Sequence, residues 1–266
     1  MIPKICHFIW TNKSSMSWMQ TLSVLSFKRY NPDWAIKIHL IKQIPQELGA
    51  NVYVPEYTGE DHFQSLSNFD IDLHDIYDEG IANDKHGIQV SDILRMRLLH
   101  RVGGVYSDFD TLWLKPMSKF YEVYTENFET TICQHAGDKH HNASNLVSEP
   151  NGSFLAAVIA LQNRINRPPY DYQAYNNALL NRWFRNWDRV KKTYPRLLKI
   201  DYETFYPYDV YHPERQWKED NLSYLVEKTV AVHWFNGNNL SKEFINRNDY
   251  TIPCSITSIL KKEGYL

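Results

Sequence analysis

The chain has 266 residues, which is enough for one large α/β domain or two small ones, and either could bury a sizeable core. It carries 29 basic and 31 acidic residues, so its formal charge of −2 gives no overall field that would favour nucleic acid. The three cysteines, Cys6, Cys133 and Cys254, lack metal-binding spacing and indicate a reduced compartment. No apolar run reaches about 18 residues and no signal-type segment opens the chain, so we expect a cytoplasmic protein without a transmembrane segment.

The first forty residues predict a strand, a helix and a second strand. Residues 1–10, MIPKICHFIW, form an apolar run typical of a buried parallel strand. Residues 18–30 have the apolar spacing of a helix, and residues 35–41, AIKIHLI, predict the next strand. This βαβ unit is typical of nucleotide-binding α/β sheets, which bind ligands beyond the carboxyl ends of their strands. Trp10 and Thr11 occupy that place in the chain.

Three patterns allow a metal-binding interpretation but have a simpler one. His7 lies in the apolar first strand and is more typical of a hydrogen-bonded core histidine than of a ligand. Asp70 and Asp72 form a D-x-D ahead of a helix-like pattern at 71–79, and helix capping is the better interpretation. The histidines within 135–141 are irregularly spaced around a glycine, which favours a loop.

The stretch 91–116, SDILRMRLLHRVGGVYSDFDTLWLKP, combines several signals in order. Its apolar positions recur at spacings of three and four, which predicts an amphipathic helix with Ser91 as the N-cap. Gly103 and Gly104 then end the helix, because glycine readily adopts the left-handed conformation of a C-terminal stop. Residues 105–107 predict a short strand after it.

Two carboxylates follow that strand directly. Asp108 and Asp110 are one residue apart where the chain leaves the predicted sheet. Such a pair can supply hard oxygen ligands to a divalent cation and leave positions free for a diphosphate. A lone D-x-D is more often a turn, so its significance depends on the surrounding sequence.

That surrounding sequence resembles a known family. The order S-D-x-x-R, helix, G-G-x-Y, D-x-D and Leu-Lys-Pro is similar to the sugar-binding segment of DXD-containing glycosyltransferases of family 32. Fungal outer-chain mannosyltransferases, bacterial capsule transferases and the glucosyltransferase domains of clostridial toxins are its relatives. The opening I-P-K-I-x-H-x-I-W and the late pair His233-Trp234 also resemble segments of this family.

The resemblance implies an α/β fold of the GT-A type, a Rossmann-like nucleotide-binding sheet with flanking helices in a single domain, 1–266. Residues 1–116 would form the nucleotide-sugar-binding half, and residues 117–266 the acceptor half with a closing loop. The implied activity is metal-dependent transfer of a hexose, with retention of configuration, from a nucleoside diphosphate sugar to a glycan or other hydroxyl acceptor. UDP-sugars are favoured weakly, and polysaccharide biosynthesis is the implied process.

The resemblance also implies roles for individual residues. Asp108, Asp110 and His233 would hold Mn²⁺ or Mg²⁺. Arg95 would hold the donor sugar and offset diphosphate charge. The remaining donor-binding candidates are Trp10 as the base-stacking ring, Thr11, Asp92, Tyr106, Trp234 and Asn145, for which Asn142 is an alternative.

Two other function classes remain open from the sequence. A nucleotide-sugar hydrolase or nucleotidyltransferase would share the aspartates but release a different product. A non-catalytic glycan- or nucleotide-binding module is the third class, and the intact D-x-D gives it little support. No feature of the sequence indicates an oligomeric state.

Overall fold

The computed structural model describes the chain except residues 11–14, 43–56, 76–78, 82–86, 135–140 and 166–173. Eight of the described strands form one mixed sheet in the order β3-β2-β1-β4-β8-β6, with β7 and β9 both paired to β6. These strands are β1 (Ile5–Trp10), β2 (Ala35–Lys42), β3 (Asp70–Asp75), β4 (Gly104–Ser107), β6 (Thr130–Gln134), β7 (His141–Asn142), β8 (Asn145–Ser148) and β9 (Leu197–Ile200). A separate antiparallel pair consists of β5 (Thr111–Trp113) and β10 (Ala231–His233).

The predicted βαβ unit is present at the N-terminus. β1 runs parallel to both β2 and β4, and the connection from β1 to β2 contains α1 (Trp18–Tyr30). Ser17 begins this helix with a capping box, in which its side chain accepts from the Gln20 N–H and the Gln20 side chain accepts from the Ser17 N–H. The expected mixed α/β architecture is confirmed.

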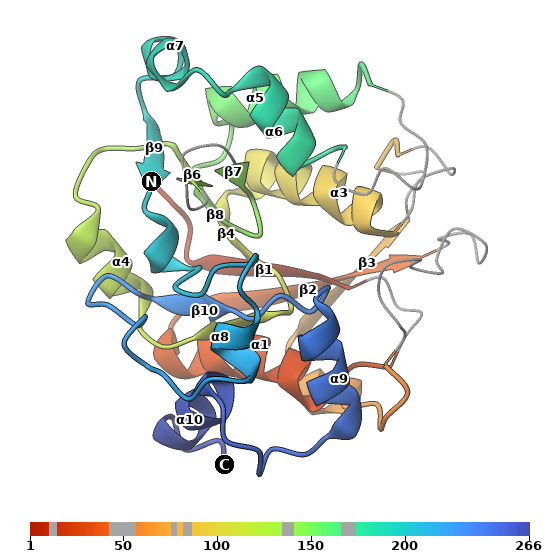
Figure 1. Ribbon diagram of the computed structural model, residues 1–266. Coiled ribbons are helices and arrows are strands. Elements are labelled where there is room, and N and C mark those ends of the chain that lie inside the picture. The colour runs from red at the N-terminus through yellow and green to blue at the C-terminus, as the bar shows by residue number, and fades with distance from the viewer. Residues whose placement is uncertain (11–14, 43–56, 76–78, 82–86, 135–140, 166–173) are drawn as a thin grey trace.

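Helices cover both faces of the sheet. In β1, Cys6 and Phe8 pack into the core on the α1 side, whereas Ile9 belongs to the core beneath α3 (Gly87–Val102) and α5 (Ser153–Gln162). Figure 1 shows α3, α5 and α6 on one side of the sheet and α1 with α10 on the other. The other helical segments are η1 (Phe63–Leu66), α4 (Met117–Val123), α6 (Asn177–Trp183), α7 (Trp187–Thr193), η2 (Tyr202–Thr204), α8 (Glu214–Trp217), α9 (Asn239–Arg247) and α10 (Ser255–Lys262).

The glycine pair connects α3 to β4, as the sequence predicts. Gly103 has φ +73° and Gly104 has φ +105°, and a Cβ on Gly104 would lie 2.4 Å from the Ile5 carbonyl oxygen. Only glycine fits this conformation and this close approach to β1. The chain therefore turns directly from the helix into the strand that ends at Asp108.

Two local predictions are wrong. Helix α3 begins at Gly87, so Ser91 lies inside it and is not the N-cap. Asp70 and Asp72 do not cap a helix, because they lie in β3, which pairs in parallel with β2. Lys37 on β2 lies 3.1 Å from one carboxylate and 3.2 Å from the other, and this cross-strand charge pairing suits the strand.

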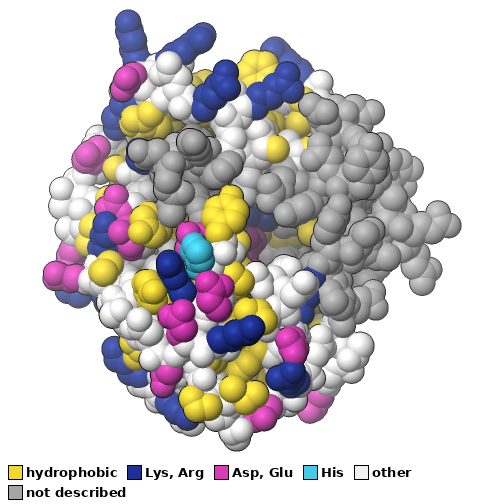
Figure 2. All heavy atoms as spheres, in the orientation of Figure 1, with side chains coloured by type: hydrophobic (Ala, Val, Ile, Leu, Met, Phe, Trp, Pro, Cys, Tyr) yellow, Lys and Arg dark blue, Asp and Glu magenta, His cyan; other side chains and the backbone are white. Residues whose placement is uncertain are grey.

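Charges of both signs are mixed on the part of the surface that Figure 2 colours by side-chain type. On the face shown in Figure 2, acidic and basic side chains are interspersed among hydrophobic and neutral ones, in agreement with the net charge of −2. None of the described helices is both long and apolar enough to cross a bilayer.

Candidate functional site

The site is built around the turn between β4 and β5, which carries both aspartates. Asp108 follows β4 and Asp110 precedes β5. The Asp108 N–H donates to the Ser144 carbonyl at 3.0 Å. The pairing of β10 with β5 places His233 opposite Thr111, next to this turn. The backbone therefore brings His233 to the aspartates although it lies far from them in sequence.

The three predicted metal-binding side chains converge. His233 Nε2 lies 2.9 Å from Asp110 Oδ1 and 3.9 Å from Asp108 Oδ2. One ligand atom from each of the three residues lies within 4.8 Å of the other two. The Asn236 N–H donates to Asp110 Oδ2 at 2.8 Å, which fixes the orientation of that carboxylate.

Two atoms of this cluster are buried without a hydrogen bond. Asp110 Oδ1 and His233 Nε2 face each other at 2.9 Å, but neither makes a hydrogen bond of acceptable geometry. Buried polar atoms are normally satisfied, so this pair needs another partner. A divalent cation fits, because two carboxylates and one imidazole form an O,O,N donor set that suits Mn²⁺ and other first-row ions.

The charges around the cluster are strongly coupled. Burial opposes a charged imidazole, but the carboxylates of Asp110 and Asp108 outweigh it and raise the pKa of His233 to about 9. Burial alone would raise the pKa of the Asp108 carboxyl, yet the charges of Arg95 and His233 lower it below its usual value. The lowered pKa keeps the Asp108 carboxylate ionised in a partly buried environment, which attracts a cation.

Arg95 is the buried cation beside these carboxylates. Its guanidinium lies 3.0 Å from Asp92 Oδ1 and 3.4 Å from Asp108 Oδ1, and it donates to the Ala143 carbonyl at 3.0 Å. Its carbon centre lies 4.4 Å from the centroid of the Tyr106 ring. Arg95 and Asp92 share one face of α3, as predicted from their spacing.

Asp92 is the least accessible carboxylate of the site. Burial raises its pKa to about 7, and the charge of Asp108 adds to this effect, while Arg95 and Asn176 oppose it. Asn176 donates to Asp92 Oδ1 at 3.1 Å. Asn176 precedes α6, and the sequence offers no local signal that would have identified it as a partner of Asp92.

The aromatic candidates occupy different positions. Trp10 is the last residue of β1. Its ring packs edge-on against the ring of Phe109, the residue between the two aspartates, and the ring centroids are 5.2 Å apart. Tyr106 is buried beneath Arg95, and its hydroxyl donates to Asp108 Oδ1 at 2.5 Å. Trp234 is fully buried, but its backbone N–H donates to the Asp110 carbonyl at 2.8 Å.

Of the remaining predicted donor-binding residues, the two asparagines lie on strands β7 and β8, and Thr11 lies outside the described residues. Asn145 is fully buried in β8 and donates to Thr111 Oγ1 at 3.2 Å, so it supports the start of β5. Its alternative, Asn142, lies in β7. Thr11 and most of the run 135–141 lie outside the described residues.

Sequence reasoning missed one residue that holds the turn. Ser23 in α1 is fully buried; its hydroxyl donates to the Phe109 carbonyl at 2.8 Å and accepts from the Thr111 N–H at 3.2 Å. It therefore fixes the backbone on both sides of Asp110. A serine within a helix carries no sequence signal for such a contact.

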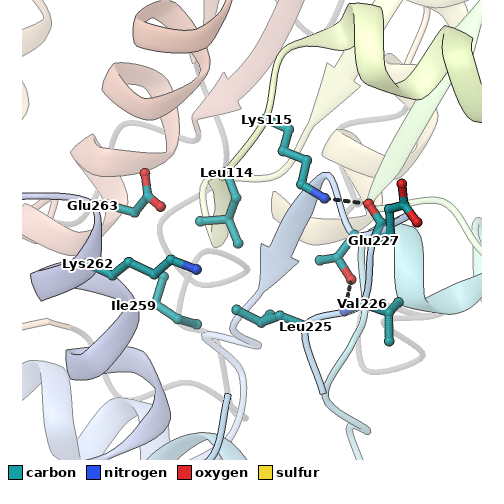
Figure 3. Close-up of a pocket in the computed structure, with 9 residues that line it drawn as sticks. Leu114, Lys115, Leu225, Val226, Glu227, Ile259, Lys262 and Glu263 are labelled. Carbon is teal, nitrogen blue, oxygen red and sulfur yellow. Dashed lines mark hydrogen bonds between the residues drawn. The ribbon is translucent and has the colours of Figure 1, made fainter. Parts of the chain in front are cut away.

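A surface cavity of about 290 Å³ lies elsewhere. It is formed by the segment after β5, residues 225–229 and α10, and Figure 3 shows Leu114, Ile259 and Lys262 among its lining side chains. None of the candidate site residues lines it.

Several solved structures are similar to this chain at low identity. They include the PaToxG glycosyltransferase, with 16% identity over 73% of this chain and 70% of that one and a TM-score of 0.46. The galactosyltransferase LgtC in complex with donor and acceptor sugar analogs matches with 10% identity over 94% and 97% of the chains and a TM-score of 0.44. The apo-form glycosyltransferase GlyE of Streptococcus pneumoniae TIGR4 matches with 12% identity over 98% and 64%, with a TM-score of 0.46.

The mixed sheet therefore carries the Asp-Phe-Asp turn at the end of β4, and the pairing of β10 with β5 places His233 opposite that turn. Residues 2–129 match the model of the family described as the glycosyltransferase sugar-binding region containing a DXD motif. The match covers just under half of the chain and includes Arg95, Asp108 and Asp110 but not His233. No curated protein matches the chain by sequence.

Proposed function

We propose that this protein is a glycosyltransferase with a GT-A type fold, and that it moves a hexose from a nucleoside diphosphate sugar, with UDP-sugars favoured, to a hydroxyl group of a glycan or another acceptor. The observation that carries the proposal is the cluster of Asp108, Asp110 and His233, in which Asp110 Oδ1 and His233 Nε2 are buried without hydrogen bonds. These three side chains would hold Mn²⁺ or Mg²⁺. A cation bound there would neutralise the charge that develops on the diphosphate leaving group.

His233 must change its hydrogen bonding to act as a ligand. In the neutral form of the ring, the Phe235 N–H can donate to His233 Nδ1 at 3.3 Å, which leaves the ring proton on Nε2. Ligation through Nε2 requires the proton on Nδ1, so this long contact must open. Phe235 has φ +53°, a strained conformation for a residue with a side chain, and relaxation there would release the contact.

The remaining donor contacts follow from the residues around the cluster. Arg95 lies 3.4 Å from Asp108 and remains charged, so it can neutralise diphosphate charge next to the cation. Asp92 holds Arg95 in place and would orient the donor sugar. Trp10, at the carboxyl end of β1, would stack on the nucleotide base.

The two halves of the chain would bind different substrates. Residues 1–116 would bind the nucleotide sugar, and residues 117–266 would supply the acceptor contacts and the loop that carries His233. Retention of configuration is part of the proposal. No carboxylate nucleophile is assigned, so attack from the face that the leaving group vacates is the compatible route.

A donor panel tests this function. The protein is incubated with UDP- and GDP-hexoses and Mn²⁺ or Mg²⁺, with and without sugar acceptors, and nucleoside diphosphate release and product configuration are followed by NMR. We expect metal-dependent diphosphate release with transfer to an acceptor and a retained anomeric centre. Release of free sugar alone would identify a hydrolase, and nucleotide transfer would identify a nucleotidyltransferase.

Asp110→Asn tests the metal site itself. We expect turnover to fall about 10²- to 10³-fold, the size of effect seen when one electrostatic contact to the developing charge is removed. Asp33→Asn is the matched control, because Asp33 is an exposed aspartate paired with Lys4 away from the cluster. Unchanged turnover in Asp110→Asn would contradict the metal site, and absence of any nucleotide-sugar binding would contradict the proposed function.

A further inference from the structure

A second cluster of side chains lies across the three parallel strands at one end of the sheet. His7 on β1, His39 on β2 and His74 on β3 form a continuous chain of rings, since β1, β2 and β3 are adjacent (Figure 1). His7 Nδ1 lies 2.9 Å from His39 Nε2, and His39 Nδ1 lies 2.7 Å from His74 Nε2. None of these residues takes part in the donor site.

Both ends of the chain of rings meet a hydrogen-bond acceptor. His7 Nε2 lies 3.0 Å from the Gly103 carbonyl oxygen, and His74 Nδ1 lies 3.1 Å from Glu79 Oε1. Arg101 donates to both oxygens of the Glu79 carboxylate, at 3.3 and 3.2 Å, so this group acts as an acceptor. A carbonyl and a carboxylate can only accept, so the terminal histidines must donate outwards.

Counting protons shows that three neutral histidines cannot satisfy this chain. It has four contacts, namely carbonyl to His7, His7 to His39, His39 to His74, and His74 to carboxylate, and each contact needs one proton. Three neutral imidazoles supply one proton each. If His7 and His39 donate toward the carbonyl and His74 donates toward the carboxylate, two lone pairs face each other at 2.7 Å. One additional positive charge is required between His39 Nδ1 and His74 Nε2.

The surroundings of that contact include a third possible ligand. Asp72 on β3 points its Oδ2 toward it and also accepts there from Lys37 Nζ at 3.2 Å. Asp72 Oδ2 lies 3.9 Å from His39 Nδ1, too far for a hydrogen bond but within reach of a shared cation. One ligand atom from each of His39, Asp72 and His74 lies within 4.8 Å of the other two.

The outer contacts are those of an oriented metal ligand. A histidine that binds a metal through one nitrogen usually donates its other N–H to a carbonyl, a carboxylate or another acceptor, which fixes the tautomer. His74 has Glu79 in this role, and His39 has His7, which is itself fixed by the Gly103 carbonyl. The Asp72 side chain is 39% exposed and gives the contact a path to solvent at the strand edge.

We propose that His39, Asp72 and His74 form a second cation site, which binds a divalent transition metal of the Zn²⁺ class through two imidazole nitrogens and one carboxylate oxygen. Nitrogen and carboxylate ligands at three positions, with water as the fourth, suit tetrahedral Zn²⁺. Zn–N bonds of about 2.0–2.1 Å require the two nitrogens to separate to roughly 3.3 Å. Rotation of the His74 side chain, on the outermost strand of the sheet, provides that movement.

The site would link separate parts of the fold. Glu79 pairs with Arg101 and its carbonyl accepts from Arg97, both on α3, while His7 reaches the carbonyl of Gly103 at the end of that helix. A cation between β2 and β3 would therefore stabilise the strand edge together with α3. Its binding does not depend on the proposed function, because it shares no ligand with the Asp108 site.

Zinc titration tests the proposal in protein whose donor site has been disabled. Metal-stripped Asp108→Asn/Asp110→Asn protein is titrated with Zn²⁺ by calorimetry, and the Co²⁺ adduct is examined by absorption spectroscopy. We expect one equivalent of Zn²⁺ and a Co²⁺ spectrum typical of nitrogen and oxygen ligands. Adding His74→Gln should weaken binding at least about 100-fold, and adding Asp72→Asn should weaken it about tenfold.

His212→Gln in the same background is the matched control, because His212 pairs with Glu214 at 3.1 Å on the exposed surface. It should keep the full equivalent. Circular dichroism and urea unfolding verify that each variant folds. If the double variant binds no Zn²⁺, a proton completes the chain of histidines and the proposal is overturned. If His74→Gln retains tight binding, the cation lies elsewhere and the assignment is wrong.

Discussion

The hydroxyl of Ser23 bridges the peptide groups on both sides of Asp110. It donates to the Phe109 carbonyl at 2.8 Å and accepts from the Thr111 N–H at 3.2 Å, so a helix residue fixes the backbone of the metal-binding turn. Because Ser23 is fully buried, no water can replace its hydroxyl without rearrangement. The position of the Asp110 carboxylate thus depends on the packing of α1 against β5.

Ser23→Ala should therefore reduce both stability and metal binding. It leaves a buried carbonyl and a buried N–H without partners, which costs about 1–3 kcal/mol in the free energy of unfolding. We expect a higher Mn²⁺ requirement for turnover and a lower urea midpoint. Ser26→Ala is the control, since Ser26 accepts from the Trp113 N–H at 3.0 Å further along β5. Equal Mn²⁺ requirements in the two variants would contradict a specific role for Ser23.

Arg95→Lys should be strongly disruptive although it conserves charge. A lysine cannot reproduce the simultaneous contacts to Asp92, Asp108 and the Ala143 carbonyl. Leaving the buried Asp92 carboxylate without its partner costs about 3–5 kcal/mol. We expect a lower urea midpoint and a large loss of turnover. Arg247→Lys, in an exposed pair with Glu243, should change neither quantity, and a similar small effect for both variants would argue against the buried cluster.

Gly104→Ala should prevent normal folding at the entrance to β4. The added Cβ would lie 2.4 Å from the Ile5 carbonyl oxygen, in a backbone conformation of φ +105° that disfavours any side chain. We expect insoluble protein, or a loss of several kcal/mol if it folds, since overpacking alone costs about 1–3 kcal/mol. Gly237→Ala is the control, because its Cβ would meet no atom within 4 Å. Normal stability of Gly104→Ala would show that β1 and β4 are less closely packed.

The stability of the protein should fall at alkaline pH, in part through Tyr121. Burial raises the pKa of Tyr121 to about 12, whereas an unfolded tyrosine titrates near 10. Between these values the unfolded state binds fewer protons than the folded state, so the free energy of unfolding decreases as pH rises, by up to about 1.4 kcal/mol per pH unit. Urea midpoints can be measured from about pH 9 to about pH 12, which spans the folded and unfolded pKa values of Tyr121. With rising pH, the midpoint should fall more steeply for the wild type than for Tyr121→Phe. Parallel curves would show that Tyr121 is not shielded from water.

Local patterns were sufficient for much of the N-terminal half. The apolar run of β1, the spacing of α1 and the glycines at 103 and 104 each depend on neighbours in the chain, and all three predictions are confirmed. The D-x-D at 108–110 could be interpreted as a metal-binding pair because it follows this order of elements. The same local reasoning was wrong for Asp70 and Asp72, because pairing with β2 and the charge of Lys37 override a helix-like pattern.

The amino-acid sequence by itself thus determined the order of elements and the two carboxylates at the end of β4, since periodicity and glycine conformation act over a few residues. Only the tertiary structure decided which distant side chains join them. The register of β10 against β5 brings His233 to Asp110, and the adjacency of β1, β2 and β3 aligns three histidines. Such contacts result from strand pairing and helix packing between segments far apart in the chain, for which no short sequence pattern exists.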